Sequence, residues 1–164
     1  MADFSHLKKL AVTESSEAEY VFEDIVLGKD KDGADICPSI WFRPMTEANP
    51  DFLNERVRLA VERAETAKKE TRNQRRQRLL SSEQLEDDRE LDRVLMARTC
   101  VIRWGTPMPD AEGKVHDLDE EQALAFFRAL PSHMFDPCRG FVGNVYNFFD
   151  RAALSAESAD KLGN

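Results

Sequence analysis

A reversal of charge in the middle of the chain does most to limit how it can fold. Residues 68–78 contain six basic side chains and one acid, whereas residues 83–92 contain six acids and one arginine. Charges at this density are too costly to bury without individual partners, so the segment has to lie outside the hydrophobic core. The core must therefore be built from the sequence on either side of it.

The N-terminal flank has the pattern of a β-hairpin over residues 18–43. Aromatic and β-branched residues dominate EYVFEDIV and ICPSIWF, and the turn-forming stretch GKDKDG separates these two runs. The turn holds three carboxylates, but their spacing does not match an EF-hand calcium loop and no glutamate follows at the required distance. We expect a solvated turn. These carboxylates are Asp30, Asp32 and Asp35.

Two helices are predicted around the charge reversal. Asn49 is a suitable N-cap and Pro50 a suitable first helical residue. An apolar stripe at helical spacing follows, which we expect to pack on the core. Its members are Leu53, Val57, Ala60, Ala64 and Ala67. Ser81 and Gln84 form a capping box for the second helix, whose apolar stripe begins at Leu91.

The polar ends of these two helices allow two interpretations. In the first, the helices are antiparallel, turn near residues 79–82, and project residues 68–90 as a charged hairpin in which basic and acidic side chains face each other. Each such surface pair contributes only about 0.2–1 kcal/mol, so several would have to act together. In the second, residues 68–90 are disordered, which their composition permits.

The C-terminal part predicts two further helices. Asp117 and Glu120 offer a capping box, and Pro131 ends the first of them. Its apolar stripe consists of Ala123, Phe126, Phe127 and Leu130. The last helix is expected to start at Pro137 and to run through PCRGFVGNVYNFFDR, with apolar residues on two faces. The preceding stretch TCVIRWG fits either a helix end or a short strand.

Together these patterns predict the α+β class, with an N-terminal β-hairpin or small antiparallel sheet packed against a mainly helical body. Residues 1–17 are expected to be a flexible lead-in, residues 18–151 a single domain and residues 152–164 a flexible tail. Three cysteines at wide spacing do not form a disulfide framework, and no apolar run reaches the length of a membrane span. We therefore expect a soluble cytoplasmic protein without membrane association.

The sequence offers no convincing reactive site. It has neither a G-x-S-x-G nucleophile turn nor a P-loop, and His133 with Cys138 lacks a second ligand pair for zinc. We expect no catalytic, cofactor or metal site. The net charge of −8 disfavours nucleic acid, and the basic stretch 68–78 has no aromatic residue for base stacking and an acidic run beside it.

Protein binding is the remaining class. Aromatic residues concentrate near the C-terminus, and a helix that is apolar on two faces has more apolar surface than docking onto one core requires. We expect a groove between the last two helices that accepts an amphipathic partner helix. The predicted contact residues are Phe126, Phe127, Phe141, Val145, Phe148 and Phe149.

The order of these pieces resembles the tail assembly chaperones of long-tailed, siphovirus-like bacteriophages. The shared features are the hairpin, the ANPDFLN helix start, the charged middle, the stretch VIRWGTPMPDAEGKVHDLDEEQALAFFRALP and the NFFDR helix end. In that family a tryptophan-to-glycine segment precedes a short D-x-x-x-A helix. The matching positions here are Trp104, Asp110, Gly113, Asp119 and Ala123.

The resemblance implies a non-enzymatic role. Such proteins coat the helical tape-measure protein in the host cytoplasm before the tail tube forms and are absent from the mature virion. Tail tube subunits and further copies of the protein along the client are the other partners that the resemblance implies. Two alternatives remain open. One is a structural virion or head–tail component, and the other is a nucleic-acid-binding regulator that uses residues 68–78.

Overall fold

Two small antiparallel sheets and four α-helices make up the part of the chain that the structure, a computed structural model, describes: residues 11–13, 15–69, 71, 73–74 and 83–149. In chain order the elements are β1 (Ala18–Val21), β2 (Gly28–Lys29), β3 (Asp35–Ile36), β4 (Ser39–Phe42), α1 (Pro50–Lys68), α3 (Glu83–Thr99), β5 (Val101–Trp104), α4 (Glu120–Ala129), α5 (Ser132–Gly143) and the 3-10 helix η2 (Val145–Phe148). The predicted α+β class is confirmed. The predicted tail and most of the predicted lead-in lie outside the described residues.

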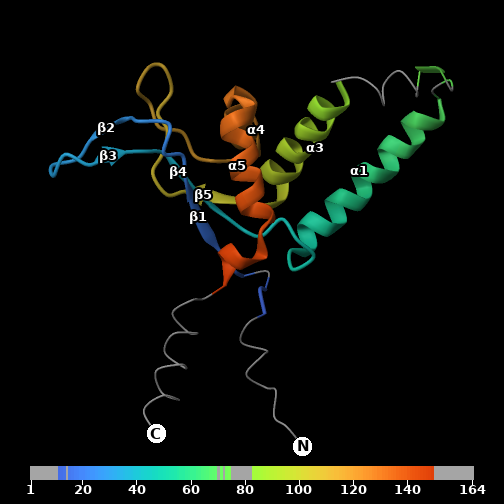
Figure 1. The fold of residues 1–164 in the computed structure, drawn as a ribbon, viewed down its shortest axis with the longest axis horizontal. Coiled ribbons are helices and arrows are strands. Elements are labelled where there is room, and N and C mark those ends of the chain that lie inside the picture. Colours follow the sequence, from blue (N-terminus) through green and yellow to red (C-terminus); the bar gives the residue numbers. More distant parts are fainter. Residues whose placement is uncertain (1–10, 14, 70, 72, 75–82, 150–164) are drawn as a thin grey trace, which may run out of the picture.

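The larger sheet has three strands in the order β1-β4-β5. β1 and β4 are antiparallel, with Ala18 opposite Phe42, which confirms the predicted hairpin between residues 18 and 43. β2 and β3 extend this hairpin as a separate two-stranded ribbon (Figure 1). The stretch VIRW is the strand β5, paired with β4, and not a helix end. The sheet therefore joins two segments that lie far apart in the sequence.

The aspartates of the β2–β3 turn organise the turn itself. One carboxylate oxygen of Asp30 accepts the amide hydrogens of Asp32 and Ala34, both at 2.9 Å. Gly33 has a φ of 85°, a left-handed conformation that favours glycine. Asp110 and Gly113 repeat this arrangement in the loop before α4, with Gly113 at a φ of 81°. Hydrogen bonds within the two turns thus account for the carboxylates of Asp30 and Asp110.

Asn49 fixes the start of α1. Its side-chain oxygen accepts the amide hydrogen of Phe52 at 3.3 Å, and Pro50 is the first residue of the helix, as predicted. Its amide nitrogen donates to the carbonyl of Thr99 at 2.9 Å, at the end of α3. Asn49 is fully buried, so a single side chain caps one helix and ties it to another.

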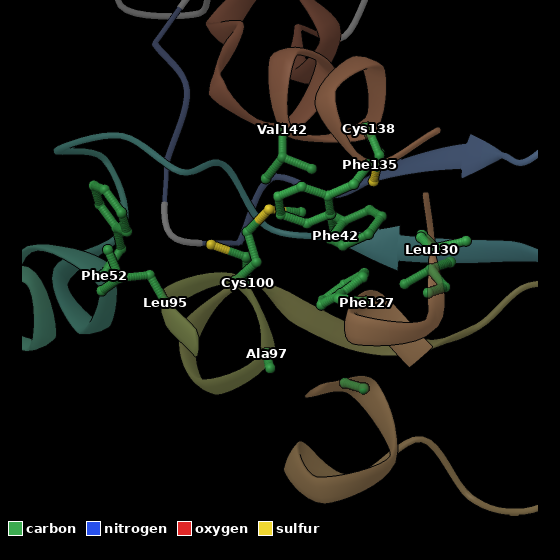
Figure 2. Close-up of a cluster of buried hydrophobic side chains, with 14 of the residues drawn as sticks. Phe42, Phe52, Leu95, Ala97, Cys100, Phe127, Leu130, Phe135, Cys138 and Val142 are labelled. Atoms are coloured by element: carbon green, nitrogen blue, oxygen red, sulfur yellow. The ribbon is translucent and has the colours of Figure 1, made fainter. Parts of the chain in front are cut away.

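The core lies between the sheet and the helices. Figure 2 shows Phe135, Cys138 and Val142 of α5 gathered over Phe42 of β4, with Phe127 of α4 beside them. The rings of Phe42 and Phe127 are stacked with centroids 6.3 Å apart. All five of these side chains are fully buried.

The acidic run of α3 has arginine partners on several described elements. Glu90 pairs with Arg128 of α4 at 2.5 Å, and Asp92 pairs with Arg139 of α5 at 2.9 Å. Asp88 pairs with Arg63 of α1 at 3.3 Å, and Arg63 also donates to the backbone carbonyl of Asp87 at 2.8 Å. These pairs hold α3 against the body. The predicted turn at 79–82 and the capping residue Ser81 lie outside the described residues, so the projecting hairpin stays a prediction.

The last two helices differ in detail from their predicted bounds. The N-cap of α4 is Asp119, which accepts the amide hydrogen of Gln122 at 2.8 Å, and not Asp117. α5 begins at Ser132 and contains Pro137 instead of starting there. It ends at Gly143, because Asn144 adopts an extended backbone and caps η2. The predicted single helix with two apolar faces is therefore a helix followed by a separate 3-10 turn.

Gly105 provides a test of the sheet packing. A Cβ atom at this position would collide with Glu19 Oε1 and Ser39 Oγ, which are hydrogen-bonded to each other at 2.6 Å. We predict that Gly105→Ala lowers the free energy of unfolding by about 1–3 kcal/mol, measured by urea denaturation. Gly28→Ala is the matched control, since no atom lies within 4 Å of its added Cβ. Equal stability of the two variants would contradict the packing.

Candidate functional site

Two of the six predicted contact residues are buried in the core, and the other four are half-buried. Phe127 and Phe148 belong to the core, with exposed fractions of 0% and 5%. They cannot meet a partner while the domain is folded, which corrects the prediction for these two side chains. The other four are half-buried, so contact through them stays a prediction. These four are Phe126, Phe141, Val145 and Phe149.

A continuous row of packed aromatic rings explains why the predicted contact residues are largely buried. Neighbouring ring centroids lie 5.0–6.1 Å apart along a path from β5 through α4 and β1 to α5 and η2. The row consists of Trp104, Phe126, Phe22, Tyr20, Phe141 and Phe148. Edge-to-face and tilted pairs of this kind hold elements together. The C-terminal aromatics are thus the side chains that join helices to sheet.

Three of the large exposed apolar residues lie on α1. Leu53, Val57 and Val61 are 44%, 57% and 55% exposed, and their spacing of four residues places them along one side of the helix. Among the described elements, the main neighbour of α1 is α3, and Figure 1 shows α1 at the outer end of the molecule. We call Leu53, Val57 and Val61 the α1 apolar face.

The α1 apolar face corrects the predicted orientation of this helix. The sequence predicts that Leu53 and Val57 pack on the core, but Phe52 and Leu59 do so instead. Phe52 and Leu59 are seven residues apart and lie on a neighbouring side of the same helix. Sequence periodicity alone therefore offers two apolar stripes, and the structure buries the shorter one.

Glu55 lies on the same side of α1 as Phe52 and Leu59 and links this helix to α3. Its carboxylate accepts hydrogen bonds from Arg58 at 2.6 Å and from Arg98 of α3 at 2.7 Å. The Arg58 bond, supported by that of Arg98, lowers the pKa of Glu55 from 4.5 to about 2. Arg98 also bonds Glu120 of α4 at 2.8 Å. These bonds support the orientation in which Phe52 and Leu59 face the core and the α1 apolar face lies outside.

Two surface cavities reach the last two helices, and each is bounded by only one of them. The first, of about 460 Å³, lies between β1 and α5 and includes Tyr20, Met134 and Phe141. The second, of about 320 Å³, lies between α4 and the preceding loop and includes Phe126 and His116. Neither of these two cavities lies between the two helices, so the expected groove stays a prediction.

The two buried cysteines of the described residues are not suited to nucleophilic chemistry. Burial raises the pKa of Cys100 to about 12 and also raises that of Cys138, so both thiols stay protonated at neutral pH. His116 bonds Asp110 at 2.8 Å and thereby lowers the pKa of this carboxyl group. Within the described ranges, no three His, Cys, Asp or Glu side chains form a cluster suited to a metal ion.

The nucleic-acid alternative stays open. Lys68 and Lys69 are exposed, but the four arginines of the basic run lie outside the described residues. The acids expected to neutralise this run pair largely with arginines elsewhere, so that argument against nucleic-acid binding is weakened. In the described part of the chain, no helix is both long enough and apolar enough to cross a membrane.

Comparisons with protein-family models, with curated proteins and with solved structures each found no match to this chain. The exposed surfaces of the described residues are therefore the features that bear on function. Of these, the α1 apolar face is formed by the largest set of exposed aliphatic side chains on a single helix.

Thiol reactivity tests the burial of the cysteines. Cys37 is half-buried, whereas Cys100 and Cys138 are fully buried. We predict that one thiol of the native protein reacts rapidly with an aromatic disulfide reagent at pH 8, and that all three react after denaturation. Cys37→Ser should remove the rapid phase. Two rapid thiols in the native protein would contradict the packing of α5 on α3.

Phe148 tests the assignment of the C-terminal aromatics to the core. Phe148→Asp removes a buried ring and buries a charge, so we predict a loss of roughly 3–5 kcal/mol in the free energy of unfolding. Tyr146→Asp, two residues away and 64% exposed, is the control and should change stability little. A Phe148→Asp variant as stable as the control would show that the ring is not core.

Proposed function

We propose that this protein is a non-enzymatic chaperone that binds an amphipathic helix of another protein through the α1 apolar face. The observation that carries the proposal is the exposure of Leu53, Val57 and Val61 on one side of a 19-residue helix. Apolar residues four apart on a helix are the pattern by which one helix packs against another. A partner with a matching apolar stripe would cover them.

The size of this face favours weak contact repeated along a client. Covering the exposed half of one valine or leucine contributes about 1 kcal/mol. Three such residues yield about 3 kcal/mol, which is less than the usual entropic cost of association. Useful occupancy therefore requires many copies side by side on one long client, where neighbouring copies can also support each other.

The charge of the protein suits this arrangement. A long helical protein whose apolar stripes face water aggregates, and a coat of copies that each carry a net charge of −8 keeps such an assembly dispersed through mutual repulsion. The charged residues Arg58 and Glu62, paired with each other on the surface of α1, keep the helix hydrated beside its apolar face. Coverage and dispersal are the two properties that a chaperone of this kind needs.

The resemblance to phage tail assembly chaperones implies that the client is the tape-measure protein. The tape-measure protein is long and largely helical, and it must stay soluble until the tail tube forms around it. On this proposal the protein acts in the host cytoplasm, presents the coated client to tail tube subunits, and leaves before the virion matures. The helical character of the client matches the α1 apolar face.

Co-expression with a helical fragment of the tape-measure protein tests the proposal. We predict that the unaltered protein increases the soluble yield of the fragment severalfold, and that the double variant Val57→Glu and Val61→Glu abolishes this increase. Both valines are more than half exposed, so the variant should keep its thermal unfolding midpoint.

Val115→Glu is the matched control, because Val115 is 53% exposed and lies in the loop before α4. This variant should solubilise the fragment as well as the unaltered protein does. Full activity of the double α1 variant would refute the assigned surface. If the unaltered protein did not increase the soluble yield of the fragment, the proposed chaperone function would be refuted.

A further inference from the structure

β1 has one open edge whose backbone groups point away from the sheet. In an antiparallel pair, residues alternate between bonding their partner and pointing away from it. Phe22 donates its amide hydrogen to the carbonyl of Pro38 at 2.9 Å, which fixes this alternation. Tyr20 consequently bonds β4, and Glu19 and Val21 direct their N–H and C=O groups outward. Among the described strands, none pairs with this edge.

Hollows on both faces of the sheet flank this open edge. On the side of α5, the cavity of about 460 Å³ has an apolar wall formed by Met134, Pro137 and Phe141. On the other side, a cavity of about 570 Å³ includes Ile36 and Cys37. A strand added to β1 would thus find an apolar surface for the side chains that face α5, in register with Tyr20.

The edge is acidic. Glu19, Glu23 and Asp24 all line the first cavity, and Glu19 and Glu23 also line the second. Glu19 accepts a hydrogen bond from Ser39 at 2.6 Å, while Glu23 and Asp24 have no ion-pair partner among the described residues. Pairing β1 with a second copy of itself would place these acids against one another, which disfavours a dimer through this edge.

From these features we infer that the open edge of β1 binds an extended segment of another protein in which apolar residues alternate with lysine or arginine. The apolar side chains lie against Met134, Pro137 and Phe141, and the basic ones lie on the opposite face, beside Glu19 and Glu23. Backbone hydrogen bonds to Glu19 and Val21 complete a fourth strand. This site is independent of the α1 apolar face and does not rest on the proposed chaperone function.

Fluorescence anisotropy with a labelled peptide of alternating valine and lysine tests the site on the full chain. The decisive comparison uses two methylated forms of the peptide, one carrying N-methyl groups on its lysine amides and the other on its valine amides. An added strand bonds β1 through only one of its two edges, so one form should bind about tenfold more weakly and the other within about twofold of the parent. Equal effects of the two modifications would overturn the proposal.

Val21→Pro tests the same edge from the side of the protein. It removes an amide hydrogen that points outward and leaves the bonds between β1 and β4 in place, so the thermal unfolding midpoint should hold. We expect peptide binding to weaken about fivefold, whereas Val21→Thr, which keeps the amide hydrogen, should bind normally. Unchanged binding by a folded Val21→Pro variant would overturn the proposal, and the methylated peptides decide the matter if this variant unfolds.

Two further variants test whether the acids of the edge contribute to binding and whether the occupant is another protein. Glu23→Gln combined with Asp24→Asn should weaken the peptide severalfold at low salt and have less effect at high salt. Lys8→Glu combined with Lys9→Glu should leave binding unchanged. Tighter binding by this second variant would show that the chain's own N-terminal segment competes for the edge, and would overturn the assignment to another protein.

Discussion

The burial of Phe42 under α4 and α5 is the constraint on which the rest of the structure depends. Phe42 lies on the central strand, stacks on Phe127 and is covered by Phe135 and Val142. This packing commits the aromatic residues of the last helices to one face of the sheet. α1 reaches the core mainly through Phe52 and Leu59, so the rest of this helix has little to pack against. The exposed α1 apolar face is a consequence of how the core is filled.

The two surfaces that we propose as binding sites differ in chemistry. The α1 apolar face consists of aliphatic side chains on a helix and suits a helical partner. The β1 edge consists of backbone groups with acids around them and suits an extended basic partner. A protein that offers both can hold a long helical client and a second, differently shaped protein at the same time. This combination would suit an assembly factor that brings two components together.

Local patterns allowed much of this fold to be predicted from the sequence. The hairpin follows from alternating residues around a turn, the start of α1 from Asn49, and the stripe of α4 from the spacing of Ala123, Phe127 and Leu130. The orientation of α1 could not be predicted, because it follows from contacts distant in the sequence: Phe52 enters the core, and Glu55 bonds Arg98, 43 residues away. The open edge of β1 is equally non-local, since it follows from β5 taking the other side of β4.

The end of α5 is a different kind of error, because its signal was present in the sequence. Gly143 and Asn144 form a pair typical of a turn, and the Asn144 side chain accepts the amide hydrogen of Tyr146 at 3.1 Å. A helix continued through this pair gives the predicted two apolar faces, whereas the structure ends α5 at Gly143. We propose that the contact surface lies on α1.

Methyl NMR of the protein with a helical tape-measure fragment tests this proposal most directly. The account predicts that the signals of Leu53, Val57 and Val61 move on addition of the fragment while that of Val145 stays. Movement of the Val145 signal with those of α1 unchanged would contradict it.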